Sequence, residues 1–151
     1  MKQYIRNTVS GILLICMAIT VLLPTGCSKA SHNGDLDGQW QVMEVLNNGV
    51  SEQFPEGEIY YYNFYLHTFQ LTYTGKRSLR MTGNMTYEEG SGRLGLELGF
   101  VTAGRVDKSL LDRLVYWGFP ESGEVVMEIE TLTSSQLIMR HGDVEIICRK
   151  F

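Results

Sequence analysis

The most regular feature of the sequence is an alternation of apolar and polar side chains. Four segments show it most clearly, at residues 79–87, 93–100, 125–130 and 144–149. A period of two residues is typical of β-strands that bury one face and expose the other. Clusters of Gly, Asn, Asp and Ser, which form turns, separate these segments. The pattern therefore predicts an antiparallel meander, in which consecutive strands pair through short turns.

Two earlier segments extend the predicted sheet. Residues 38–46 form the first strand, and residues 58–73 form a stretch of 16 residues that is longer than most strands. We expect a break or bulge near residues 63–67, which gives either two strands or one strongly bent strand. The total is about eight strands, and an antiparallel sheet of this size hides its edges as a sandwich or a closed barrel. We predict an all-β fold, an antiparallel sheet of about eight strands with one short helix.

The predicted helix lies where the two-residue period stops. Within residues 107–116, leucines and a valine recur at helical spacing and share one face. Asp107 suits the N-cap position, Gly118 sits where a helix-ending glycine is common, and Pro120 follows. We expect this helix to pack on the barrel or to plug one of its ends.

The amino-terminal segment has the pattern of an export signal. Lys2 and Arg6 precede an apolar run at residues 11–23, which is shorter than the roughly 20 residues that span a bilayer. The tripeptide TGC at residues 25–27 follows, and it resembles the lipobox of bacterial lipoproteins. The resemblance implies that Cys27 becomes the new amino terminus and carries a diacylglyceryl group, whose acyl chains hold the protein at a membrane. The alternative is an ordinary secretory signal with an incidental cysteine.

These features divide the chain into three predicted parts. Residues 1–26 form a lipoprotein signal peptide, residues 27–36 a flexible tether, and residues 37–151 the barrel domain. The tether carries no acidic residue before Asp35, so it gives no argument for display on the outer surface. We expect a lipid-anchored protein of the cell envelope, at the outer membrane and facing the periplasm.

Charge and reactive side chains exclude several functions. The leader holds two of the 13 basic residues and none of the 17 acidic ones, so the remaining chain has a net charge of −6. Such a domain is a poor partner for nucleic acid. His32, His67 and His141 show no metal-ligand spacing, and we expect no metal or other cofactor. Cys148 lies in an apolar string and suits a buried position better than a nucleophilic role. We therefore expect a protein that is not an enzyme.

The start of the predicted barrel resembles that of the lipocalins. The segment LDGQW, residues 36–40, matches the Gly-x-Trp opening of lipocalins and related calycins. The carboxy-terminal strands are similar to the closing hairpins of lipocalin-like domains in bacterial envelope lipoproteins. The resemblance implies that the sheet closes as an antiparallel eight-stranded up-and-down barrel with one short helix. It implies structural roles for Gly38 and Trp40, with Trp40 packed across the closed end of the barrel. It also implies that an arginine from the last strands, Arg140 or Arg149, stacks on Trp40.

A barrel of eight strands is just wide enough to be packed solid or to hold one small ligand. Tyr61, Tyr65, His67 and Phe69 share one face of the aromatic segment as a continuous strand, where they either pack in the core or line a ligand cavity. Glycines within the strands mark either sharp coiling or room for a ligand. We expect a lipid-anchored lipoprotein that binds a small apolar or amphipathic ligand. The alternative is an interaction module without a cavity that docks on another envelope protein.

Overall fold

The computed structural model describes residues 31–75, 78–102, 104 and 108–151. Its strands are β1 (Gly38–Asn47), β2 (Val50–Ser51), β3 (Ile59–Tyr65), β4 (Thr68–Thr74), β5 (Leu79–Glu88), β6 (Arg93–Glu97), β7 (Glu124–Leu132), β8 (Gln136–His141) and β9 (Val144–Lys150). Its short helical elements are η1 (Gly34–Leu36), α2 (Gly99–Thr102), α3 (Lys108–Leu111) and η2 (Leu114–Trp117), where η marks a 3₁₀ turn. None of the helices in the described part of the chain is long and apolar enough to cross a membrane.

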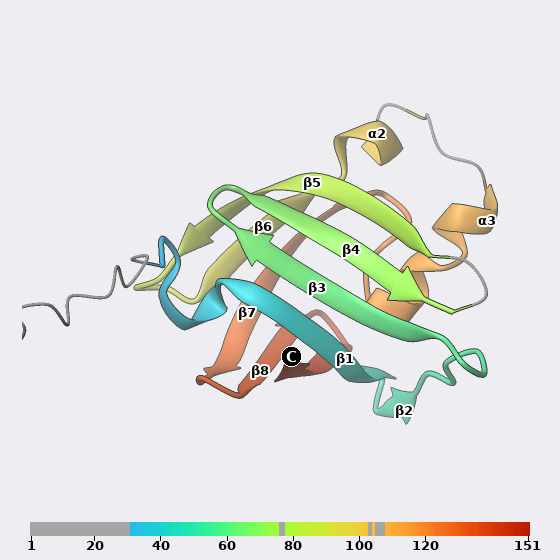
Figure 1. Cartoon of the computed structure of the whole chain (residues 1–151), viewed down its shortest axis with the longest axis horizontal. Coiled ribbons are helices and arrows are strands. Elements are labelled where there is room, and N and C mark those ends of the chain that lie inside the picture. Colours follow the sequence, from blue (N-terminus) through green and yellow to red (C-terminus); the bar gives the residue numbers. More distant parts are fainter. Residues whose placement is uncertain (1–30, 76–77, 103, 105–107) are drawn as a thin grey trace, which may run out of the picture. The chain divides into compact units, whose positions relative to one another are not determined.

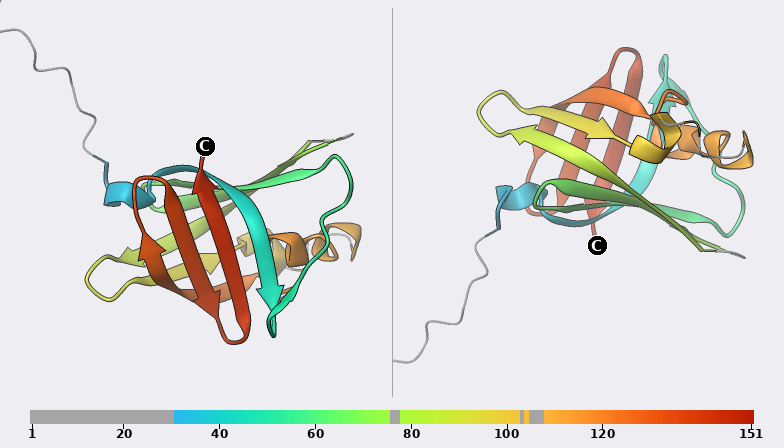
Figure 2. Two further views of the ribbon diagram at one scale, coloured as in Figure 1. Left: turned by 90° about the horizontal axis from the view of Figure 1, so that it is seen from below. Right: turned by 90° about the horizontal axis from the view of Figure 1, so that it is seen from above.

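The strands form a closed antiparallel barrel. From β3 to β9 each strand pairs with the next in chain order, β1 pairs with β3, and β9 returns to pair with β1 (Figures 1 and 2). The two-residue β2 extends the sheet beside the end of β1, so eight longer strands make the wall. The prediction of an eight-stranded up-and-down barrel is confirmed.

The aromatic segment at residues 58–73 breaks into two strands, β3 and β4, rather than one bent strand. The turn between them contains Leu66, whose φ is +53°. Because the turn resets the alternation, β3 points its even-numbered residues inward and β4 its odd-numbered ones. Inward partners such as Tyr62 and Leu71, or Phe64 and Phe69, therefore face each other across the two strands.

The two ends of the barrel carry different elements. The closed end holds η1 and the turn between β3 and β4, whereas the opposite end, which we call the mouth, carries α2 and α3 (Figure 1). Residues 31–36, expected to belong to a flexible tether, are part of the folded domain. Leu36 is fully buried, and the side-chain amide of Asn33 donates to the Leu66 carbonyl oxygen at 2.8 Å. The carboxylate of Asp37 accepts hydrogen bonds from the backbone of this segment.

The predicted helix occurs at the expected place but in two pieces, α3 and η2. Asp107, the expected N-cap, lies outside the described residues. Gly118 ends η2 in the left-handed conformation with φ at +60°, as its position after the helical pattern indicated. The ion pair between Lys108 and Asp112 spans the end of α3 at 2.8 Å.

Candidate functional site

The mouth of the barrel is shaped by a separation of β1 from β3. These two strands pair from Gly38 to Gln41 on β1, and the register ends at the pair Gln41–Tyr61. The turn η2 occupies the position beside β3 beyond this point. Trp117 Nε1 donates to the Tyr61 carbonyl oxygen at 3.0 Å, and the Tyr62 hydroxyl donates to the Trp117 carbonyl oxygen at 2.6 Å. Trp117 thus ties η2 to β3 through one hydrogen bond from its side chain and one to its backbone.

Residues 114–119, which we call the plug, insert apolar side chains into the barrel. Trp117 is fully buried, and its ring contacts Tyr60 edge to face at 4.8 Å between centroids. Phe119 stacks on Phe69 at 5.8 Å. The plug therefore fills the space at the mouth where an open barrel would admit a ligand.

The strand glycines do not leave room inside the barrel. A Cβ atom at Gly83 would lie 2.4 Å from Cε1 of Phe69, so the phenylalanine ring already occupies that space. Gly95 faces outward, because its neighbours Leu94 and Leu96 are buried, and a Cβ there would meet Oγ1 of Thr86 at 2.5 Å. These glycines therefore mark close packing in the barrel wall and do not provide room for an internal ligand.

A polar cluster fastens the plug to β3. The Arg113 guanidinium pairs with the Glu58 carboxylate, which also accepts a hydrogen bond of 2.5 Å from the Tyr60 hydroxyl. The same guanidinium lies over the Tyr73 ring, 4.7 Å from its centroid. Burial acts to raise the pKa of Glu58, but the hydrogen bonds from Tyr60 and Arg113 outweigh it and lower that pKa. The carboxylate is therefore held in its charged form.

A depression of about 300 Å³ lies beside the plug at the mouth. Its apolar lining comes from β1, α3, the plug and β9, through Val45, Leu111, Val115, Phe119, Pro120 and Val144. Its polar lining consists of Asn47, Glu52, Asp112, Glu121 and His141. His141 fixes one side, because its Nε2 donates to the Gly118 carbonyl oxygen at 2.6 Å.

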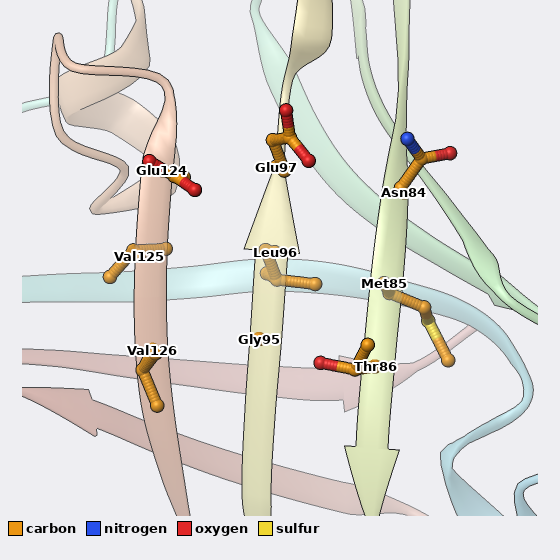
Figure 3. Close-up of a pocket in the computed structure, with 9 residues that line it drawn as sticks. All are labelled: Asn84, Met85, Thr86, Gly95, Leu96, Glu97, Glu124, Val125 and Val126. Atoms are coloured by element: carbon orange, nitrogen blue, oxygen red, sulfur yellow. The ribbon is translucent and has the colours of Figure 1, made fainter. Parts of the chain in front are cut away.

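A second depression, of about 470 Å³, lies on the outer wall over β5, β6 and β7 (Figure 3). Gly95 forms its floor, between Thr86 and Val126 on the neighbouring strands. Glu97, Glu124 and Asn84 lie at one end of it (Figure 3). The carboxylates of Glu97 and Glu124 occupy directly paired positions, which disfavours an apolar ligand there.

The structure does not bring together the four residues predicted to line a ligand cavity. Phe69 lies in the core, whereas Tyr61 is on the outer face and is covered by the ring of Phe151. Tyr65 is 53% exposed, and His67 is exposed in the turn, where its ring contacts His32. The turn between β3 and β4 breaks the single face that a continuous strand would have given them.

The residues predicted to close the barrel occupy different places in the structure. Trp40 is fully buried, and its Nε1 donates to the Leu36 carbonyl oxygen at 2.8 Å. The cation over its ring is the Lys150 ammonium group, with Nζ 4.3 Å from the centroid, and not the guanidinium group of Arg140 or Arg149. Arg140 pairs with Glu130 and Glu145 on the outer wall, and Arg149 donates to Gln41.

The alternation along β9 explains this correction. Ile146 and Cys148 point inward, so Lys150 continues the inner row and is the register partner of Trp40, whereas Arg149 points outward. Gly38 lies beside it, with φ at +122°, and a Cβ there would be 3.1 Å from the lysine Cε. The two-residue period in the sequence could therefore have predicted that Lys150, and not an arginine, contacts Trp40.

The remaining candidate reactive groups are Cys148, the predicted lipidation site Cys27 and the side chains that could bind a metal ion. Cys148 is buried, and burial raises the pKa of its thiol far above the usual value. No group of three or more His, Cys, Asp or Glu side chains within residues 31–151, the undescribed positions aside, could hold a metal ion. Cys27, the predicted lipidation site, lies outside the described residues.

Comparisons with known proteins agree with this architecture. A family model described as a lipocalin-like domain matches residues 20–151. A lipocalin-like protein from Bacteroides uniformis has a crystal structure with a TM-score of 0.61 and 26% identity, and the alignment covers 78% of this chain and all of the other. An uncharacterized protein from Bacteroides eggerthii shares the fold, with a TM-score of 0.59, 17% identity and coverage of 77% and 99%. No curated protein matches the chain. The chain therefore belongs to the family of lipocalin-like domains.

Proposed function

We propose that this protein is a lipid-anchored lipoprotein of the cell envelope that binds a small amphipathic molecule at the mouth of its barrel. The observation that carries the proposal is the depression of about 300 Å³ beside the plug. This volume is at the lower end of the range for small-molecule sites, which also occur at the mouths of β-barrels. An apolar wall with polar groups on one side suits an amphipathic molecule, which has an apolar part and a polar part.

The proposed ligand lies beside the plug and not within the barrel. Trp117, Leu114 and Phe119 fill the space that an internal ligand would need. Val115, on the same turn, is 37% exposed and lines the depression, so it offers a contact without rearrangement of the core. Binding to such a preformed surface requires no displacement of buried aromatic rings.

Titration with the neutral apolar dye N-phenyl-1-naphthylamine tests the proposed site. We expect the dye fluorescence to rise to saturation as protein is added. The dissociation constant of the dye should be about fivefold higher for Val115→Gln, which removes roughly 1 kcal/mol of apolar contact. Val126→Gln is the matched control, since Val126 is an exposed valine of the outer wall that does not line the depression at the mouth. Equal weakening by both substitutions, or dye fluorescence that does not saturate, would rule out the mouth as the site.

Native mass spectrometry of the purified domain tests whether a natural ligand exists. We expect an additional mass that disappears when the protein is unfolded and refolded. A clean mass of the protein alone, together with no dye binding, would favour a second function, in which the domain docks on another envelope protein. The filled interior of the barrel is the observation that supports this second function.

The proposed anchoring rests on the leader and on Cys27. A positive end, an apolar run and the TGC tripeptide are the features of a lipoprotein signal, and they support attachment to a membrane of the cell envelope. We propose that this membrane is the outer membrane and that the domain faces the periplasm. Incorporation of radiolabelled palmitate by cells expressing the full chain is expected, and Cys27→Ser should abolish it. Labelling that persists in the variant would show that the anchor is not at this cysteine.

A further inference from the structure

A third depression, of about 460 Å³, lies on the outer wall over β1, β3, β4 and β5. The strand register places its side chains in two adjacent rows. Gln39, Asn63 and Gln70 form the first row, because Gln39 pairs with Asn63 and Asn63 with Gln70. We call these three residues the amide row. Tyr61, Thr72 and Arg80 form the second row on β3, β4 and β5.

The amide row differs in chemistry from the rest of this acidic domain. Among the described residues no carboxylate lines the depression, and its polar groups are amides and hydroxyls apart from the Arg80 guanidinium. Asn63 Nδ2 donates to Thr72 Oγ1 at 3.1 Å, which orients this amide. Within the described part of the chain, no hydrogen bond engages the side-chain amides of Gln39 and Gln70. Each of these amides can donate and accept hydrogen bonds at the same time.

An exposed aromatic ring stands at the edge of the same depression. Phe151 is 73% exposed, and its ring lies edge to face against Tyr61 at 5.5 Å. The backbone holds it in place, since Phe151 N donates to the Gln39 carbonyl oxygen at 2.9 Å. The depression therefore combines unengaged amides with an apolar ring beside them.

We propose that this face binds a neutral saccharide chain. Sugar hydroxyls donate and accept hydrogen bonds together, which amides match, and the C–H face of a sugar ring is apolar, which the phenylalanine ring matches. The three amides stand on neighbouring strands and span about 10 Å, roughly the length of two sugar rings. An extended peptide is a poorer fit, because Asn63 lies on a strand that pairs on both sides and offers no free backbone edge.

Affinity electrophoresis of the domain in native gels tests this proposal. The gels contain dextran, galactomannan or xylan, each a neutral polysaccharide, and a gel without polysaccharide is the reference. We expect at least one polysaccharide to retard the domain. Gln39→Ala combined with Gln70→Ala removes two hydrogen-bonding groups and should weaken binding roughly 30-fold. Both residues are on the outer wall, so thermal unfolding should confirm that the variant folds.

The matched control replaces two polar residues of the other outer depression, Asn84→Ala with Thr86→Ala. It should be retarded as strongly as the unchanged domain. The absence of retardation in all three polysaccharide gels would overturn the proposal, and so would an equal loss in the test and control variants. The mouth site involves none of these residues, so dye binding there is expected to be the same in both variants.

Discussion

Replacement of Trp117 tests whether the plug holds the mouth together. In Trp117→Ala the barrel loses a fully buried indole, and such truncations cost about 3–5 kcal/mol of unfolding free energy. The change also leaves the Tyr61 carbonyl oxygen without its hydrogen-bond donor, a loss of about 1 kcal/mol. We expect Trp117→Ala to lower the free energy of unfolding by about 4–6 kcal/mol, near the total stability of a small domain.

Trp117→Phe separates the two contributions, because it keeps most of the ring contact with Tyr60 but removes the Nε1 donor. A loss of about 1–2 kcal/mol is expected for this variant. Urea unfolding followed by far-ultraviolet circular dichroism measures both variants, and the fluorescence of Trp40, the other tryptophan, provides an independent probe. Val115→Ala is the control on the same turn, with an expected change within about 0.5 kcal/mol. A cost below about 1 kcal/mol for Trp117→Ala would refute a structural role for the plug.

Three further substitutions test other parts of the barrel. Gly118→Ala should lower the free energy of unfolding by about 2 kcal/mol or more, measured in urea, because φ is +60° and the added Cβ would lie 2.6 Å from the Ile146 side chain on β9. Gly142→Ala is the control, since φ is +54° but the space around it is open, and it should cost about 1 kcal/mol. Glu58→Gln should destabilise the domain at pH 7. Since the folded pKa of Glu58 is below its ordinary value of 4.5, the stability that its charge contributes is complete above pH 4.5 and lost as the pH falls through the folded pKa. The difference between wild type and variant should therefore shrink in unfolding curves measured below pH 4.5, and an undiminished difference would contradict the ion-pair interpretation. Lys150→Met should lower the melting temperature by several degrees, since it removes a cation from the closing tryptophan and two hydrogen bonds to carbonyl oxygens, whereas Arg149→Met should change it little.

The alternating pattern was sufficient to predict the antiparallel sheet, because burial of one strand face imposes the same period on every strand, and the resemblance to lipocalins favoured a barrel over a sandwich. It did not predict which aromatic residues point inward along residues 58–73. That outcome depends on a turn in which Leu66 adopts a left-handed conformation, and leucine is not a typical residue for it. One extra or missing residue in such a turn exchanges the inner and outer faces of everything that follows.

The plug shows a different limit of sequence reasoning. Helical spacing at residues 107–116 indicated a helix that packs on the barrel or plugs one end, but it did not single out Trp117, which follows the pattern. The role of Trp117 comes from its place beside β3 where β1 separates from that strand, with Nε1 bonded to the Tyr61 carbonyl oxygen. This arrangement depends on strand pairing across a long sequence separation, and no local pattern encodes it.

The ordered segment that begins at Ser31 has a consequence for how the domain stands at a lipid surface. Ser31 Oγ donates to Asp37 at 2.9 Å, next to the start of β1, so the chain leaves the domain beside Trp40. With Cys27 acylated as proposed, residues 28–30 separate it from Ser31, and four residue spacings reach about 14 Å at most. A tether this short would keep the end of the barrel that Trp40 closes near the headgroups, with the mouth toward the aqueous compartment. A molecule captured at the mouth would therefore arrive from solution and not by lateral diffusion out of the bilayer.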